Sequence, residues 1–158
     1  MTDELFILDA GPLGLATNSR DSGEAGRCRA WIRSALIEGS RVMVPEVVDY
    51  EVRRELIRAG RTKGLARLDV LVDQLGRLRI DSQAWHRAAE LWADARRSGK
   101  PTAAPNALDA DLLTASIAQL ATEGGWRVVV VTDNPNHLGR FVDARDWRTL
   151  AAPEPPVA

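Results

Sequence analysis

Four consecutive valines at positions 128–131 constrain the fold of this chain more than any other feature. β-Branched residues favour extended backbone, and an uninterrupted apolar run is typical of a strand buried on both faces. A second apolar run, residues 4–8, ends at Asp9 and predicts another strand. Segments with helical spacing of apolar residues lie between these runs. The sequence therefore predicts an α/β fold, a three-layer α/β/α sandwich with a central parallel sheet.

The rest of the chain is predicted to alternate between helices and short strands. The apolar spacing indicates helices over residues 30–38, 45–59, 62–75, 82–97 and 106–123. Ser82 and Asn106 are expected to cap the last two of these helices. Further strands are expected over residues 41–44 and 78–80, a break at residues 10–12, and loops at 17–26 and 98–105.

The composition is that of an ordinary globular protein and excludes several classes. Of the 158 residues, 45% are hydrophobic and 27% charged, and the net charge is −1, without the basic surplus that would itself indicate nucleic acid. The lone Cys28 excludes a disulfide framework and a thiolate zinc site, and it suits a reducing cytosol. No apolar stretch reaches the length of a membrane span, and the acidic start is unlike a signal peptide. We expect one domain over residues 1–150, a flexible Pro/Ala-rich tail over 151–158, a cytoplasmic location and no membrane partner.

Two aspartates directly follow the two predicted strands. Asp9 comes after residues 4–8, and Asp133 comes after the valine run and Thr132. Ligands of open α/β sheets bind beyond the carboxyl ends of the strands, so both side chains are candidates for one site. The alternative for each is an aspartate that starts a loop by bonding its own backbone.

Predicted helices carry further candidate acids. Asp109 and Asp111 are two residues apart and cannot share a helix face, so at most one of them is expected to point into a compact site. Asp109 has the alternative role of a helix cap. Glu51 lies beside an apolar stripe, where a carboxylate is costly unless it is paired. Its neighbours Arg53 and Arg54 offer such pairing.

Four segments, in order, resemble a known family. The stretch ILDAGPL at residues 7–13 resembles the opening motif of PIN domains, including the toxin nucleases of the VapC type. The pair VP at 44–45, with Glu51 six residues after the proline, is similar to the second motif. The stretches DLLTAS at 111–116 and VTDN at 131–134 resemble the third and fourth motifs. The order and rough spacing match from residue 5 to about residue 147.

The resemblance implies an α/β/α sandwich with an acidic pocket. Carried over by position, the active-site and metal-binding carboxylates would be Asp9, Glu51, Asp111 and Asp133. The chain departs from the family pattern in having Ala10 after the first aspartate, the extra acid Asp109, and a long stretch between the second and third motifs. These departures bear on the toxin role more than on the chemistry.

A cluster of carboxylates predicts a divalent cation. Crowded carboxylates repel one another, and a cation removes the conflict. Oxygen ligands without His or Cys select Mg²⁺, with Mn²⁺ as the alternative, and His86 and His137 are not spaced as a ligand pair. We expect Asp9 and Asp133 to be the most direct ligands. The predicted reaction is hydrolysis of RNA phosphodiesters by in-line attack of a metal-activated water, with the remaining acids holding waters.

Neighbouring polar residues are candidates for supporting roles. Thr132 or Asn134 is expected to bond a ligating aspartate or the substrate phosphate, with turn formation as the alternative for Asn134. Arg53, Arg54 and Arg140 are candidates for contacts with RNA phosphates, with a solvated surface role as the alternative.

Several functional alternatives are compatible with the sequence. The chain is predicted to be the ribonuclease toxin of a type II toxin–antitoxin pair, with a cognate antitoxin as partner. The alternatives are a PIN nuclease in RNA processing without an antitoxin, and a PIN-like module that only binds. A response-regulator-like domain would need a lysine at a late strand end, and neither Lys63 nor Lys100 is placed there. Core packing and a homodimer interface are the alternative roles of the five tryptophans, which are Trp31, Trp85, Trp92, Trp126 and Trp147.

Overall fold

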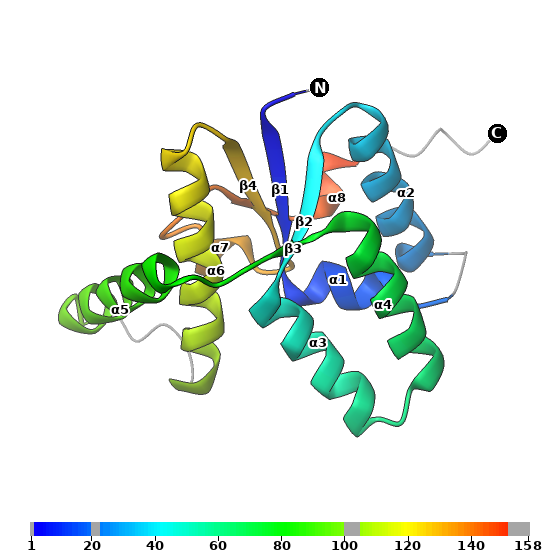
Figure 1. Cartoon of the computed structure of the whole chain (residues 1–158), viewed down its shortest axis with the longest axis horizontal. Helices are drawn as coiled ribbons and strands as arrows, with labels where there is room; N and C mark the ends of the chain where they lie inside the picture. The colour runs from blue at the N-terminus through cyan, green and yellow to red at the C-terminus, as the bar shows by residue number, and fades with distance from the viewer. Residues whose placement is uncertain (1, 20–22, 100–104, 152–158) are drawn as a thin grey trace.

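The computed structural model describes residues 2–19, 23–99 and 105–151 (Figure 1). The strands in these ranges are β1 Glu4–Leu8, β2 Arg41–Pro45, β3 Arg77–Leu78, β4 Arg127–Val131 and β5 Ala144–Arg145. The helices are α1 Ala10–Ala16, α2 Glu24–Ile37, α3 Glu46–Arg58, α4 Thr62–Leu75, α5 Ser82–Arg97, α6 Pro105–Glu123, α7 Pro135–Leu138 and α8 Trp147–Leu150. The predicted tail over 151–158 lies almost wholly outside the described residues.

Within the described ranges the strands form one five-stranded sheet in the order β3-β2-β1-β4-β5. Each neighbouring pair of strands is parallel, as the valine run predicted. β1 and β4 lie at the centre, in a register that pairs Leu8 with Val131. Because paired parallel strands finish at the same edge, the residues that follow β1 and β4 begin side by side.

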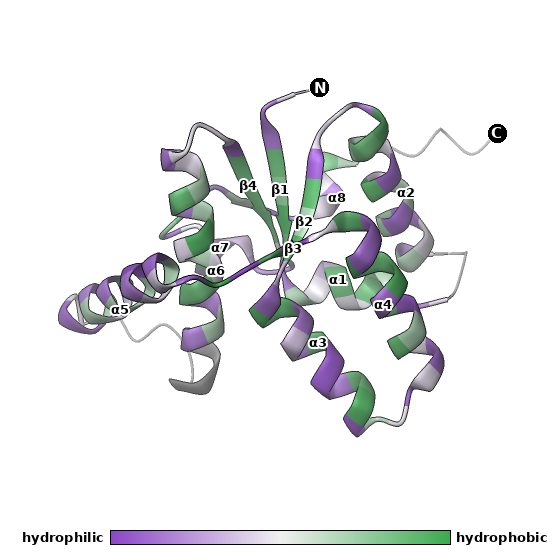
Figure 2. Ribbon diagram, viewed as in Figure 1, coloured by the Kyte–Doolittle hydropathy of each residue, from purple (hydrophilic) through white to green (hydrophobic). Residues whose placement is uncertain are grey.

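The central strands are apolar along most of their length and lie between two groups of helices (Figures 1 and 2). Their side chains alternate between two apolar layers. Phe6, Leu8, Val129 and Val131 pack with residues of α1, α2, α3, α4 and α8. Leu5, Ile7, Val128 and Val130 pack with residues of α5, α6 and α7. Both faces of the sheet are therefore covered, which explains the continuous apolar runs in these strands. The expected three-layer α/β/α sandwich is confirmed.

The predicted break at residues 10–12 was wrong, because these residues form the first turn of α1. Pro12 is tolerated there, since the N–H groups of a first helical turn have no partner within the helix. Asp9 is the N-cap residue in extended conformation, but its side chain does not cap the helix. The carboxylate of Asp9 is thereby left to make other contacts.

Other helix starts also differ from the predictions. α2 begins at Glu24 rather than at residue 30. α5 is capped by Asp81, whose side chain accepts a hydrogen bond from the backbone N–H of Ala84, and not by Ser82. α6 begins at Pro105, so Asn106 lies inside the helix. The short elements α7, β5 and α8 were not predicted, because they span too few residues to show a period.

The tryptophans divide between core and surface. Trp31 and Trp147 are buried, which matches the core-packing alternative. Trp85 and Trp92 are 54% and 41% exposed on α5. The homodimer therefore stays a prediction. In the described ranges, no helix combines the length and apolarity needed to cross a bilayer.

Candidate active site

The ends of the two central strands hold the first predicted acid. The backbone N–H of Asp9 donates to the carbonyl of Val131 over 2.9 Å, which extends the β1–β4 pairing beyond the strands. Thr132 is buried, and its hydroxyl donates to Oδ2 of Asp9 over 2.8 Å. The backbone N–H of Asn134 donates to the same hydroxyl oxygen over 3.2 Å. A short chain of hydrogen bonds thus fixes the orientation of the Asp9 carboxylate, and the hydrogen bond predicted between Thr132 and this aspartate is present.

Two further carboxylates reach this edge from helices on opposite faces of the sheet. Glu51 comes from α3, which begins where β2 ends, and Asp111 comes from the first half of α6. Burial and then the negative charges of Asp9 and Asp111 raise the pKa of Glu51 to about 7, while Arg54 opposes this shift. Burial and then Asp9 raise the pKa of Asp111 to about 6, against the opposing effect of His137. Three acids that are distant in the sequence therefore lie close enough to interact electrostatically.

The rotation of α6 about its own axis determines which of its two aspartates faces the site. Asp109 is exposed, whereas the side chain of Asp111 is only 23% exposed. Ala115 and Ala118 continue the face of Asp111 and pack against the sheet with no exposed surface. These small side chains allow the helix to lie close to the strands, which brings Asp111 towards Asp9.

Asp133 lies at the same edge of the sheet, but its carboxylate faces the start of α1. A methyl group built on Gly11 would sit 2.1 Å from Oδ2 of Asp133, so the missing side chain of Gly11 makes room for the carboxylate. The Asp133 side chain is 53% exposed, and Nη1 of Arg148 lies 3.5 Å from its Oδ1. Arg148 also pairs with Glu24 over 2.8 Å and with Asp146 over 3.1 Å. Asp133 is therefore more open to solvent than Asp111 and is bordered by a cation.

The pairing proposed between Glu51 and Arg53 is absent from the described residues. Arg53 instead pairs with Asp49 over 2.9 Å and with Asp69 over 2.8 Å. Arg54 does act on Glu51 through its charge, but it is exposed and leaves the pKa of Glu51 well above its ordinary value. A surface ion pair does not account for the position of Glu51.

Sequence reasoning missed two residues that contact these acids. Nε2 of His137 lies 2.8 Å from Oδ2 of Asp111, within hydrogen-bonding distance. The spacing of His86 and His137 tests only whether they form a ligand pair with each other, whereas His137, four residues after Asp133, comes close to the site through α7. No local sequence pattern indicates that Arg148 lies at the site, because α8 is brought near Asp133 by the packing of Trp147 into the core.

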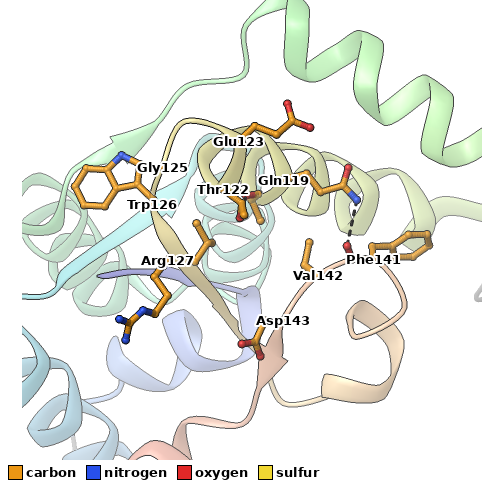
Figure 3. A pocket seen from close by; sticks show the side chains of 11 residues that line it. Gln119, Thr122, Glu123, Gly125, Trp126, Arg127, Phe141, Val142 and Asp143 are labelled. Atoms are coloured by element: carbon orange, nitrogen blue, oxygen red, sulfur yellow. Dashed lines mark hydrogen bonds between the residues drawn. The ribbon is translucent and has the colours of Figure 1, made fainter. Parts of the chain in front are cut away.

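A separate pocket of about 640 Å³ lies at the opposite end of β4 (Figure 3). It is lined by the last turn of α6, the start of β4 and the segment from Phe141 to Asp143. Gln119 crosses it and donates to the carbonyl of Phe141 over 3.1 Å. None of the four predicted site carboxylates lines this pocket, so it is distinct from the acidic edge.

The sequence matches no protein-family model and no curated protein. Solved structures do resemble the fold. VapBC2 from Rickettsia felis, solved bound to a DNA fragment, aligns with a TM-score of 0.71 and 17% identity over 90% of this chain and 98% of that chain. FitAcB from Neisseria gonorrhoeae aligns with a TM-score of 0.66 and 19% identity over 90% of this chain and 98% of that chain. VapBC from Salmonella typhimurium aligns with a TM-score of 0.63 and 22% identity over 91% of this chain and 98% of that chain. The fold is PIN-like.

The donor set at the acidic edge of this PIN-like fold fits a hard cation. The acids that converge supply carboxylate oxygens, and the unfavourable field that raises the pKa of Glu51 is one that a divalent cation would relieve. Among the described residues, no three His, Cys, Asp or Glu side chains stand close enough together to form a direct metal cage. Mg²⁺ does not need one, because it binds through one or two carboxylates and keeps several waters. Carboxylate oxygens are ligands that such an ion prefers, whereas structural zinc sites are built mainly from Cys and His.

The close approach of Gly11 and Asp133 in this PIN-like fold gives a testable prediction. Gly11→Ala is expected to push the Asp133 carboxylate aside, because the added methyl group would overlap Oδ2. The helix itself tolerates the change, since alanine is the better helix former. If Asp133 serves a metal-dependent reaction at this edge of the sheet, the rate of that reaction should fall roughly tenfold or more, the usual cost of disturbing a metal environment. Thermal unfolding is the control: an unchanged Tm with full activity would show that the position of Asp133 is unimportant.

Proposed function

We propose that this chain is a Mg²⁺-dependent endoribonuclease that acts as the toxin of a type II toxin–antitoxin pair. The observation that carries the proposal is the convergence of Asp9, Glu51 and Asp111 at one edge of the sheet, where burial and mutual repulsion raise the pKa of Glu51 to about 7. A fold keeps carboxylates in so unfavourable an arrangement when function requires them. A structural role would favour paired or exposed acids instead.

The proposed chemistry assigns a task to each side chain. Asp9 and Asp133 are the ligands proposed to bind Mg²⁺, with Mn²⁺ as the substitute, and the Thr132 hydroxyl keeps the Asp9 carboxylate in orientation. When bound, the cation lowers the pKa of water and offsets negative charge on the phosphate. Glu51 and Asp111 accept hydrogen bonds from water and hold it in line with the bond to be broken. The water oxygen would bond to phosphorus and release a proton to solvent, while the bond between phosphorus and the ribose oxygen breaks and the leaving oxygen takes up a proton from solvent.

The comparisons support the toxin role in particular. The similar solved structures are VapBC and FitAB toxin–antitoxin complexes, and this chain covers almost the whole length of the matched chains. We therefore propose RNA as substrate, an antitoxin as partner and the cytoplasm as location. A small antitoxin gene directly upstream would support this role over RNA processing, and expression of the chain alone should then arrest growth until that gene is co-expressed.

The decisive test compares two aspartates on one helix. The purified chain is expected to cleave single-stranded RNA with Mg²⁺ or Mn²⁺ and not with excess EDTA. Asp111→Asn should lower the rate by on the order of 100-fold, the usual effect of losing one stabilising group at a reacting centre. Asp109→Asn is the matched control, since Asp109 is exposed two residues earlier and should leave the rate unchanged. Cleavage that persists in EDTA, or equal rates in the two variants, would contradict the proposal.

A further inference from the structure

Two adjoining grooves lead away from the acidic edge. The first, of about 520 Å³, runs between α1 and α3 and includes Ala10, Gly11 and Glu51 in its lining. The second, of about 800 Å³, continues to the turn between α3 and α4. Gly14, Thr17, Leu56 and Arg61 line both grooves, so the two are continuous. Figure 1 shows α1, α3 and α4 together on one side of the molecule. We call this continuous surface the α1–α3–α4 groove.

Positive charge dominates the α1–α3–α4 groove. Its cationic residues are Arg54, Arg58, Arg61, Lys63 and Arg67, and its acids are Glu51 and Glu55. Some of this charge is already engaged, because Arg58 pairs with Glu55 over 2.8 Å and Arg67 donates to the carbonyl of Thr17. The exposed side chains of Arg61 and Lys63 form no ion pair with any residue in the described ranges. The net balance is cationic although the chain as a whole carries a charge of −1.

The α1 wall of the groove is built from small residues. A methyl group placed on Gly14 would meet no atom within 4 Å, so the space above this residue is open. Ala10 and Gly11 continue this low wall to the acidic edge, where Glu51 stands on the opposite side. A ligand that enters the groove can therefore lie close to the α1 backbone at Gly14, in a groove whose lining also includes Glu51.

We propose that the α1–α3–α4 groove holds the phosphates of single-stranded RNA on one side of the scissile bond. The inference rests on the proposed ribonuclease function. An acidic centre repels a polyanion, so the strand needs cations beyond that centre, and Arg61 and Lys63 supply them. Grooves that bind single strands combine such charge with a path that follows the backbone. The two parts of the groove, of about 520 and 800 Å³, have volumes in the range of ordinary ligand sites. Arg61 and Lys63 contact phosphates and do not take part in the chemical step.

The test measures RNA binding separately from cleavage. Arg61→Ala/Lys63→Ala is compared with Arg33→Ala/Arg79→Ala, which removes the same charge from exposed positions outside the groove. Binding of a fluorescent single-stranded RNA of about 12 nucleotides is followed in EDTA at several salt concentrations. We expect the groove variant to bind about tenfold more weakly and its log–log salt slope to fall by about 1.4, which is 0.7 for each lost phosphate contact. The control variant should keep the wild-type slope.

A second variant tests whether RNA lies in the α1–α3–α4 groove without changing the charge of the groove. Gly14→Leu is expected to fold, because leucine is a far better helix former than glycine and the space is open. Its side chain would fill the groove and weaken RNA binding about tenfold with an unchanged salt slope. In cleavage assays both groove variants should raise KM and leave kcat within about twofold of wild type. The contacts that they lose bind the substrate equally in the ground state and in the transition state.

Each outcome separates the groove from the proposed function. If the groove variants bind RNA as the control does, or if duplex RNA binds with the same affinity and slope, the groove is not a track for a single strand. If RNA binding depends on the groove but no divalent cation produces cleavage, the ribonuclease proposal fails and the groove assignment stands. If both groove variants cleave RNA with a divalent cation and an unaltered KM, the groove assignment is wrong and the ribonuclease proposal stands.

Discussion

Glu51→Gln is expected to abolish RNA cleavage and at the same time make the protein more stable. The glutamine keeps the size of the side chain but loses the carboxylate, so activity should fall on the order of 10³-fold if Glu51 holds water at the reacting phosphate. The gain in stability has a separate cause. Burial and the charges of Asp9 and Asp111 raise the pKa of Glu51 to about 7, so its ionised form is unfavourable in the folded protein.

The sign of the effect follows from proton linkage. A carboxyl whose pKa is higher in the folded than in the unfolded state binds more protons when folded, so stability falls as the pH rises from about 4.5 to about 7. At pH 7.5 Glu51→Gln is free of this loss of stability, because glutamine does not ionise. With allowance for the partial exposure of the side chain, we expect about 1 kcal/mol, or a rise of about 2–4 °C in Tm.

The measurement is thermal unfolding of both proteins at pH 5 and pH 7.5 in EDTA, alongside cleavage assays with Mg²⁺. The advantage of Glu51→Gln should be present at pH 7.5 and shrink at pH 5. Glu90→Gln is the control, because Glu90 is exposed on α5 and its only described ion pair is a 3.9 Å contact with Arg87. A loss of stability in Glu51→Gln would mean that this carboxylate is held by favourable contacts, and the argument for a functional acid would fail.

Cation affinity is expected to depend steeply on pH. Glu51 and Asp111 have pKa values raised to about 7 and about 6, mainly by burial, and both must be ionised to support a cation. Between pH 7.5 and pH 5.5 both take up protons, so the apparent Kd for Mn²⁺ should increase about 100-fold. Carboxylates with ordinary pKa values would give almost no change over this range.

Calorimetric titration with Mn²⁺ at the two pH values tests this directly. Binding at pH 6.5 should also release protons, which appears as a dependence of the heat on the buffer. In Glu51→Gln only Asp111 still titrates, so the change in Kd between the two pH values should shrink to about fourfold. A Kd that is flat with pH in the wild-type protein would show that these two acids are not coupled to the cation.

Local patterns in the sequence determined the layers of this fold. The valine run 128–131 predicted a doubly buried strand, and the structure places these residues against helices on both faces of the sheet. Helix α4 has the predicted bounds, since its apolar spacing is regular and Gly76 follows its end. The candidate acids Asp9 and Asp133 were also found by local reasoning, because parallel strands deliver the residues after them to one edge. α7, β5 and α8 escaped prediction because they are too short for periodicity to appear.

Only the tertiary structure decided how the acids relate to one another. Asp109 and Asp111 are equivalent by spacing, and the packing of Ala115 and Ala118 on the sheet turned Asp111 inward. The contact of His137 with Asp111 and that of Arg148 with Asp133 join segments that the sequence leaves apart. The raised pKa of Glu51 depends on burial and on charges from two other elements. Periodicity is a property of neighbouring residues and fixes local structure, whereas electrostatic coupling depends on distances through space that only the packed chain defines.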